Sequence, residues 1–213
     1  GEAVRFPAIE IKRTINPTAM VAALSTVTDA HVAVFLSPNA ADYGLNALQR
    51  NGVALPPGIE VLAIGPGTAA RLAQSGVVAT TIPPDQFDSE ALLKLEALAT
   101  PLGKSVLIFR GEGGRDWLAN QLSEVGAQVI LIECYRRSLP EATDGKVIAR
   151  WRGQGIDVVT LTSVLAADNL VTLLSNCAEM LLRQAVIVTV SQRIAEHCAN
   201  KGWQGPLRIA SHA

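Results

Sequence analysis

The sequence predicts an α/β protein made of two doubly wound domains with parallel sheets. An apolar run, a short polar or glycine-rich loop and an amphipathic helix follow one another repeatedly along the chain, which is typical of parallel sheets with crossover helices. Phrases of the first half also recur in the second: FLSPNAADYGLNAL resembles LTSVLAADNLVTLL, and GPGTAARLAQSG resembles SQRIAEHCANKG. This long-period repeat indicates two copies of one unit. A hydrophobic content of 49% with 17% charged residues suits buried sheets.

The first half contains the elements of a complete domain. Residues 4–11 include Pro7 and predict an edge or connecting strand. A helix is expected from Pro17 to about Val27. Helices are then expected between five strands, at 32–36, 61–64, 77–82, 106–109 and 129–133.

The second half supplies fewer elements than the repeat requires. Residues 130–140 resemble 4–11 as an extended segment, so the two predict a two-stranded hinge. Strands are expected only at 158–161, 186–190 and 207–210, and 211–213 predict the start of one more helix. We therefore expect the first strand and helix of one domain to be absent, with the chain shorter than its gene product at the N-terminus. The predicted division is a connector at 1–14 (with 129–140), a complete domain at 15–132, and the C-terminal part of the other domain at 133–213.

The stretch VLIFRGEGGRDWL, residues 106–118, contains the clearest candidate site. A buried strand ends at Arg110, a turn follows that includes Gly113 and Gly114, and a helix is expected from Arg115. Backbone N–H groups at such a helix N-terminus bind anions. Arg110 and Arg115 could add charge-assisted hydrogen bonds to a carboxylate or phosphate. Either could instead pair with Glu112 or Asp116.

Other strand ends carry weaker signals. Asn39, after Ser37 and Pro38, is a candidate N-cap, and capping alone would explain this motif. Thr162 and Ser163 are its second-half equivalents.

The turn that contains Gly67 and Thr68 lacks the GK[ST] of a P-loop and the third glycine of a dinucleotide fingerprint. It predicts a tight turn whose N–H groups remain able to bind an anion. Tyr135 could either pack at the hinge or direct its phenol into a cleft between the domains.

Composition excludes several classes of function. A net charge of -1 gives no support for a nucleic-acid or membrane-surface partner, and no apolar run reaches the roughly 18 residues of a spanning helix. The three dispersed cysteines predict buried, reduced thiols in a cytoplasmic protein. Neither a metal-binding cluster nor a serine nucleophile motif is recognisable, so an enzyme of this sequence would act by positioning and electrostatics.

Taken together, the motifs resemble the uroporphyrinogen-III synthase family, whose members close a linear tetrapyrrole and invert one of its rings. Each phrase is weak alone, but their order and spacing over essentially the whole chain are specific. The phrases are FPAIEI, FLSPNAADYGL, AIGPGTAARLAQSG, FDSEALL, LIFRGEGGRDWLANQL with GAQV, YRR, LTS with NLVTLL, and SQRIAE.

The resemblance implies two flavodoxin-like domains joined by a two-stranded β-ladder, with the substrate in the cleft between them. It implies that hydroxymethylbilane loses its hydroxyl as water and closes with inversion of ring D through a spiro intermediate, without metal or organic cofactor. Tyr135 matches a tyrosine that helps the hydroxyl leave, as an assisting general acid. Side-chain carboxylate contacts are expected at Arg110 and Arg115, and backbone-led contacts at Ser37, Asn39, Gly67, Thr68, Gly113, Gly114, Thr162, Ser163 and Ser191.

Two other functions remain open from the residues alone. One is a two-domain module that binds an anionic small molecule without chemistry, and it predicts the same cleft. The other is a nucleotide-binding, flavodoxin-like regulator, which is disfavoured because no Rossmann fingerprint or receiver-type acidic cluster is present. The resemblance further suggests a monomer.

Overall fold

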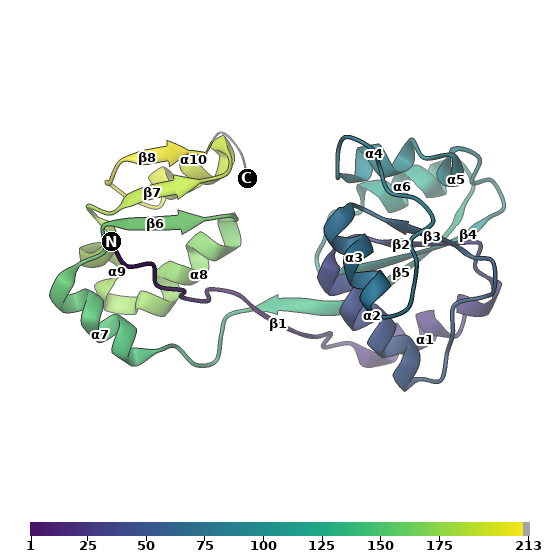
Figure 1. The fold of residues 1–213 in the computed structure, drawn as a ribbon, viewed down its shortest axis with the longest axis horizontal. Helices are drawn as coiled ribbons and strands as arrows, with labels where there is room; N and C mark the ends of the chain where they lie inside the picture. Colours follow the sequence, from purple (N-terminus) through teal and green to yellow (C-terminus); the bar gives the residue numbers. More distant parts are fainter. Residues whose placement is uncertain (211–213) are drawn as a thin grey trace. The chain divides into compact units, whose positions relative to one another are not determined.

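The computed structural model describes residues 1–210, so the helix start expected at 211–213 lies outside the described residues. The described chain divides into two compact units, each treated by itself below (Figure 1). The larger unit is Ile11–Arg137. The smaller unit combines Gly1–Glu10 with the residues from Ser138 onward.

The sheet of the larger unit follows the strand order β1-β5-β4-β2-β3. Its strands are β1 (Glu10–Arg13), β2 (Val32–Phe35), β3 (Glu60–Ala63), β4 (Ser105–Gly111) and β5 (Gln128–Ser138). The pairs β2–β3, β2–β4 and β4–β5 are parallel. All residues of β2 and β4 are buried, as expected for central strands covered on both faces.

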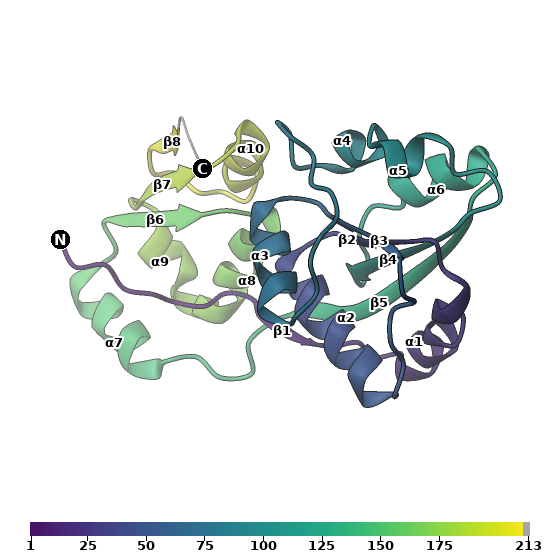
Figure 2. The ribbon, with the colours of Figure 1, turned by 45° about the vertical axis from the view of Figure 1, so that its right-hand side comes forward.

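Helices cover both faces of this sheet (Figure 2). Because side chains alternate along a strand, Ala33 and Phe35 of β2 face one cluster, and Val32 and Val34 face the other. The first cluster contains residues of α1 (Pro17–Leu24), the 3-10 turn Val27–Asp29, α2 (Pro38–Arg50) and α3 (Pro66–Gln74). The second contains residues of α4 (Ser89–Leu93), α5 (Glu96–Ala99) and α6 (Trp117–Glu124).

Gly44 lets helix α2 approach Phe109 of strand β4 closely. The rings of Phe35 and Phe109 stack with their centroids 4.4 Å apart. A Cβ added at Gly44 would lie 2.6 Å from Cδ1 of Phe109, which is too close for any side chain. This contact fixes the depth of α2, whose N-terminus carries Ser37.

The smaller unit has a parallel sheet in the order β6-β7-β8. Its strands are β6 (Val158–Leu161), β7 (Val186–Thr189) and β8 (Leu207–Ile209). Its helices are α7 (Gly145–Gln154), α8 (Val164–Leu174), α9 (Ala178–Leu182) and α10 (Gln192–Asn200), with a 3-10 turn at Ser175–Cys177. Residues from these strands and helices form one apolar cluster that includes Ile187, Ile194 and Trp203.

Strand β6 is an edge of the described sheet, and residues 1–9 run beside it without strand pairing among the described residues (Figure 1). Residues of this N-terminal segment and of β6, together with Trp151 and Ile156, line a largely apolar cavity of about 650 Å³. At the other side of the sheet, a Cβ on Gly205 would lie 1.9 Å from the carbonyl oxygen of Ala185, so only glycine fits there.

The structure corrects several predicted elements. No strand forms at 77–82, where a single bridge joins Thr81 to Leu62. Val77 and Ile82 still pack on the core, but two prolines follow at 83 and 84 and cannot donate ladder hydrogen bonds. Within the described chain, the fifth strand of this sheet is β1, which the sequence predicts as a connector.

Element ends also differ from prediction. Helix α1 ends at Leu24 because the hydroxyls of Ser25 and Thr26 bond to backbone carbonyls three residues earlier. Strand β5 continues past the predicted end at Glu133 to Ser138. The helix expected from Arg115 begins at Trp117.

Candidate functional site

The predicted loops of the larger unit follow the carboxyl ends of parallel strands, and these ends meet at one edge of the sheet. Ser37 follows β2, Gly67 and Thr68 follow β3, and the glycine turn follows β4. A Cβ on Gly67 would lie 3.8 Å from the ring of Pro38, so the first turns of α3 and α2 lie side by side. Thr68 is buried, which leaves its side chain out of reach of a ligand.

Ser37 has two contacts at this edge. It is the N-cap of α2 and accepts the backbone N–H of Ala40 at 3.0 Å. Its Oγ also lies 3.1 Å from the phenol oxygen of Tyr135. The cap was expected at Asn39, which instead lies inside the first turn of α2 and is partly exposed.

A β-bulge positions Tyr135. Along β4 and β5 Arg110 pairs with Glu133, and the next pair is Gly111 with Tyr135, so Cys134 is the extra residue. The ring of Tyr135 lies directly against Gly111, where an added Cβ would be 2.6 Å from the ring carbon Cζ. Tyr135 is only 1% exposed, so its phenol does not face solvent.

Arg137 completes this group and was not predicted from the sequence. Its Nη2 donates to the phenol oxygen of Tyr135 at 3.1 Å, and its guanidinium carbon lies 5.5 Å from the ring centroid. Residues two apart in a strand point to the same face. If the strand had been predicted to continue beyond Glu133, Arg137 would have been expected beside Tyr135. Gly111 was missed as well, because its role depends on the bulge.

Arg110 is not available to a ligand in this structure. It is 5% exposed, and its Nη1 lies 2.6 Å from a carboxylate oxygen of Asp116. Its Nη2 donates to the carbonyl of Gly114, and its Nε is 3.6 Å from Glu133. Of the two roles that the sequence left open for Arg110, the structure shows the ion pair with Asp116. Through this pair and its bond to Gly114, Arg110 stabilises the turn at 111–114.

Arg115 points away from this turn. Its Nη2 lies 2.7 and 2.8 Å from the two carboxylate oxygens of Glu90, and its side chain is 61% exposed. The guanidinium also lies over the ring of Trp117. An exposed ion pair of this kind exchanges readily with solvent and other anions.

The glycine turn is tied to the chain after β1 through Glu112. Its carboxylate accepts the hydroxyl of Thr14 and the backbone N–H of Ile15. Its own N–H donates to the carbonyl of Tyr135 at 2.8 Å. The next residue, Gly113, has φ of +66°, and Gly113 and Gly114 are both exposed.

In the smaller unit, the predicted residues lie at the carboxyl ends of β6 and β7. Ser163 caps α8 by accepting the N–H of Ala166 at 3.1 Å, at the same sequence offset as Ser37 and Ala40. Thr162 is exposed beside it. Ser191 is the N-cap residue of α10, but its hydroxyl accepts no hydrogen bond from the backbone N–H groups of this helix.

Titratable groups elsewhere give little sign of further chemistry. Burial raises the pKa of the Cys134 thiol to about 12. The hydrogen bond from His197, together with that from Lys201, lowers the pKa of Asp168. Within residues 1–210, no group of three or more His, Cys, Asp or Glu side chains could hold a metal ion.

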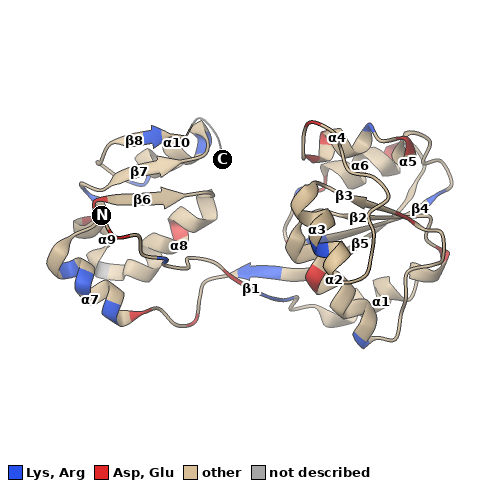
Figure 3. Cartoon of the chain, in the orientation of Figure 1, with Lys and Arg blue, Asp and Glu red and all other residues tan. Residues whose placement is uncertain are grey.

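Charged residues of both signs are distributed over each unit, with a basic group on α7 formed by Lys146, Arg150 and Arg152 (Figure 3). In the part of the chain that the structure describes, no helix has the length and apolar character needed to cross a bilayer.

A comparison with protein families decides the assignment. Residues 1–212 match the family model described as "Uroporphyrinogen-III synthase HemD". The chain belongs to the uroporphyrinogen-III synthase family. Curated relatives agree: the uroporphyrinogen-III synthase of Salmonella typhimurium is 32% identical over 209 residues, and that of Escherichia coli is 28% identical over 209 residues. Each alignment covers 98% of this chain and 85% of the relative.

Solved structures share the fold. The uroporphyrinogen-III synthetase of Helicobacter pylori aligns with a TM-score of 0.63 at 16% identity, over 96% of this chain and 84% of that one. A mutant uroporphyrinogen III synthase of Thermus thermophilus aligns with a TM-score of 0.57 at 18% identity, over 99% and 84%. The α/β architecture with parallel sheets is therefore that of the family.

Proposed function

We propose that this chain is a uroporphyrinogen-III synthase. In this reaction hydroxymethylbilane loses water and closes with inversion of ring D, giving uroporphyrinogen III for tetrapyrrole biosynthesis. The observation that carries the proposal is the match of residues 1–212 to the family, together with relatives aligned over 98% of the chain. The contact of Ser37 with Tyr135 at the carboxyl edge of the larger sheet supplies a group suited to the first step.

That step is departure of the substrate hydroxyl. Because Tyr135 is 1% exposed, the partly exposed Ser37 hydroxyl is the group that meets the substrate. Ser37 gives its proton to the departing hydroxyl, which leaves as water, and the phenol of Tyr135 restores the proton to Ser37. The positive guanidinium of Arg137 offsets the phenolate that remains.

The later steps need no further acid from the chain. Departure of the hydroxyl leaves the bilane as a protonated azafulvene, which the terminal pyrrole attacks through its substituted carbon to form the spiro intermediate. Fragmentation and recombination invert ring D, and the proton released at final closure returns to the phenolate. The protein assists these steps by holding the flexible bilane folded, which lowers the entropic cost of ring closure.

Carboxylates of the bilane are bound mainly by backbone N–H groups at helix and turn N-termini. Each such end favours an anion by roughly 0.3–1 kcal/mol when exposed. In the larger unit we assign this role to Ser37, Asn39, Gly67, Gly113 and Gly114, which are partly or fully exposed. In the smaller unit we assign it to Thr162, Ser163 and Ser191. Arg115 can bind a carboxylate in exchange for Glu90, whereas Arg110 and Thr68 act by supporting their loops.

The finer description of the fold is also a proposal. We infer two flavodoxin-like domains, with 15–132 as one and 133–213 as part of the other, and 1–14 with 129–140 as a two-stranded connector. An additional strand beside β6 would complete the sheet of the smaller unit. The unpaired edge of β6 and the apolar cavity between it and residues 1–9 support this inference.

We further propose a monomer in the cytoplasm without nucleic-acid or membrane partners. The three cysteines are free and buried, as expected where thiols stay reduced. The net charge of -1 gives no attraction to polyanions.

The test is an isomer assay. Hydroxymethylbilane is generated in situ, the protein is added, and the products are oxidised and separated as uroporphyrin I and III. Isomer III above the spontaneous background of isomer I supports the synthase. Isomer I alone, from this chain and from an N-terminally extended one, would overturn the proposal in favour of an anion-binding module without chemistry.

A further inference from the structure

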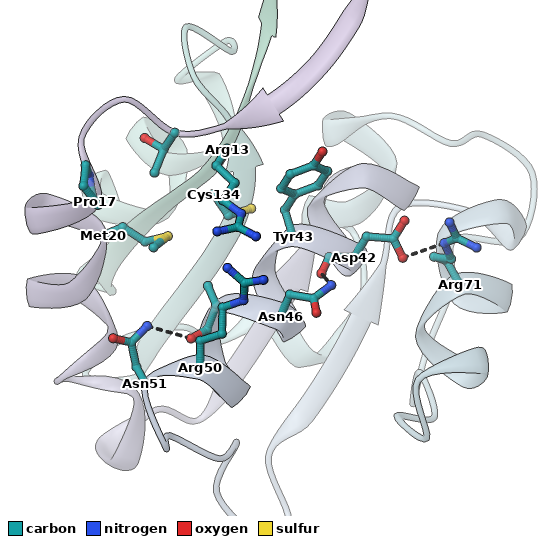
Figure 4. A pocket seen from close by; sticks show the side chains of 12 residues that line it. Arg13, Pro17, Met20, Asp42, Tyr43, Asn46, Arg50, Asn51, Arg71 and Cys134 are labelled. Carbon is teal, nitrogen blue, oxygen red and sulfur yellow. Dashed lines mark hydrogen bonds and ion pairs between the residues drawn. The ribbon is translucent and has the colours of Figure 1, made fainter.

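A second cavity lies in the larger unit, close to the residues proposed for the reaction but not lined by them. It has a volume of about 760 Å³ and lies between α2, α1 and the end of β1 (Figure 4). Neither Ser37, Tyr135 nor any residue of the glycine turn lines it. The proposed function gives this cavity no role.

Two arginines that line the cavity are exposed and have no partner among the described residues. Figure 4 shows the guanidinium groups of Arg13 and Arg50 directed toward each other across it. Among the described residues, neither side chain has a hydrogen bond or an ion pair. A third arginine, Arg71, is held by Asp42 at 2.5 Å and by Gln74 at 2.9 Å.

The balance of charge in the lining is positive. Its charged residues are three arginines and one aspartate, which gives a net charge of +2. Because Arg71 already neutralises Asp42, that excess belongs to Arg13 and Arg50. Two like charges that face each other repel, and an anion between them turns this repulsion into attraction. Guanidinium groups suit carboxylates especially well because their donors form a planar fork.

The remaining wall favours an organic molecule over an inorganic ion. Pro17, Met20 and Ala47 are apolar, and the thiol of Cys134 stays neutral because burial raises its pKa to about 12. Asn46 donates its amide N–H to the carbonyl of Asp42 at 2.7 Å, which leaves its amide oxygen as an acceptor. The volume is in the range of small-molecule pockets, about 300–1,000 Å³.

We propose that this cavity binds a small organic dicarboxylate. One carboxylate lies on Arg13 and the other on Arg50, while the carbon skeleton packs on Pro17 and Met20. Tyr43 also lines the cavity, and its ring centroid is 5.9 Å from that of Tyr135. A bound molecule would thus touch a direct neighbour of Tyr135, the proposed proton source for Ser37.

The experiment is isothermal titration calorimetry at low ionic strength, with glutarate and with benzene-1,3-dicarboxylate as probes. We expect saturable binding of at least one probe with a stoichiometry of one. The double variant Arg13→Gln/Arg50→Gln should bind that probe at least tenfold more weakly. Lys94→Gln removes an exposed positive charge from the same unit, but Lys94 lies outside the cavity. The affinity of this variant for the probe should therefore equal that of the unmodified chain.

The free proteins provide a second measurement. Since Arg13 and Arg50 repel each other when no anion is present, the double variant without probe should melt no lower than the unmodified chain. Absence of saturable binding, equal affinity in the double variant, or equally tight binding of inorganic phosphate would each overturn the dicarboxylate site. A lower melting temperature of the free double variant would contradict the unpartnered state of the two arginines.

Discussion

The hydroxyl of Ser37 and the phenol of Tyr135 lie 3.1 Å apart, although 98 positions separate them in the sequence. The contact joins the cap of α2 to the fourth-last residue of β5. It requires three local features: the serine cap, the bulge opposite Gly111, and the close approach of α2 at Gly44. The assisting acid that we propose is therefore a pair of hydroxyls, one at the start of helix α2 and one on strand β5.

Removal of the phenol hydroxyl should slow the reaction without unfolding the protein. In Tyr135→Phe the ring still packs against Gly111, but Ser37 loses its proton source. We expect kcat for isomer III to fall by about 100-fold, the lower end of what a general acid contributes. Tyr43→Phe is the matched control, since that phenol donates to the carbonyl of Ile11 and not to Ser37. Equal kcat in both variants would contradict the proposed role of Tyr135.

Gly111 should tolerate no side chain. In Gly111→Ala the new methyl would lie 2.6 Å from Cζ of Tyr135, so the ring must move. Overpacking of this kind costs about 1–3 kcal/mol of unfolding free energy, measured by urea denaturation. Gly153→Ala, in α7 with open space around it, should be neutral or stabilising. A destabilisation of Gly111→Ala no larger than this control would refute the packing argument.

Arg110 and Arg115 should differ in their effect on stability. Arg110 is 5% exposed and bonds to Asp116 and Gly114, so Arg110→Gln should cost about 2 kcal/mol. Arg115→Gln loses an ion pair whose side chains are 61% and 42% exposed, and should cost about 0–1 kcal/mol. Chemical denaturation of both variants measures the difference. Equal costs would mean that Arg110 does not hold the turn.

Acid should weaken the contact between α8 and α10. His197 and Lys201 lower the pKa of Asp168 in the folded protein, so the carboxylate contributes stability above its unfolded pKa of about 3.9. This contribution is lost as the pH falls through the folded value. Asp168→Asn should therefore lower the melting temperature at pH 7 but not near pH 2. A gap between variant and unmodified protein that persists at pH 2 would contradict this assignment.

The repeated strand–loop–helix pattern was enough to predict most of the architecture. Central strands such as Val32–Phe35 are apolar throughout, and this marks them clearly. Residues 77–82 mislead because Val77 and Ile82 are apolar for packing, while backbone pairing is limited to a single bridge. The strand at Glu10–Arg13 is polar and close to a proline, so its pairing comes from the neighbouring β5 and not from its own composition.

The site was less accessible from sequence. Ser37 and Tyr135 were both candidates, but their contact depends on a bulge that no residue pattern announces. Arg110 was a candidate carboxylate partner because it lies at the end of a strand beside a glycine turn, whereas in the structure it bonds to Asp116 and Gly114. Arg13 and Arg50 were not candidates at all, since one ends a strand and the other a helix, and only folding brings them to one cavity.

The bulge at Cys134 also limits which changes in the length of β5 preserve the contact between Ser37 and Tyr135. Cys134 and Tyr135 both pack on the same apolar cluster, so the alternation of side chains along β5 is interrupted at this point. Deletion of Cys134 would restore the alternation and still leave Tyr135 opposite Gly111. One more residue inserted between Cys134 and Tyr135 would instead turn Tyr135 and Arg137 together to the other face of the sheet. Single-residue insertions compatible with activity should therefore be absent here and fall in the loops.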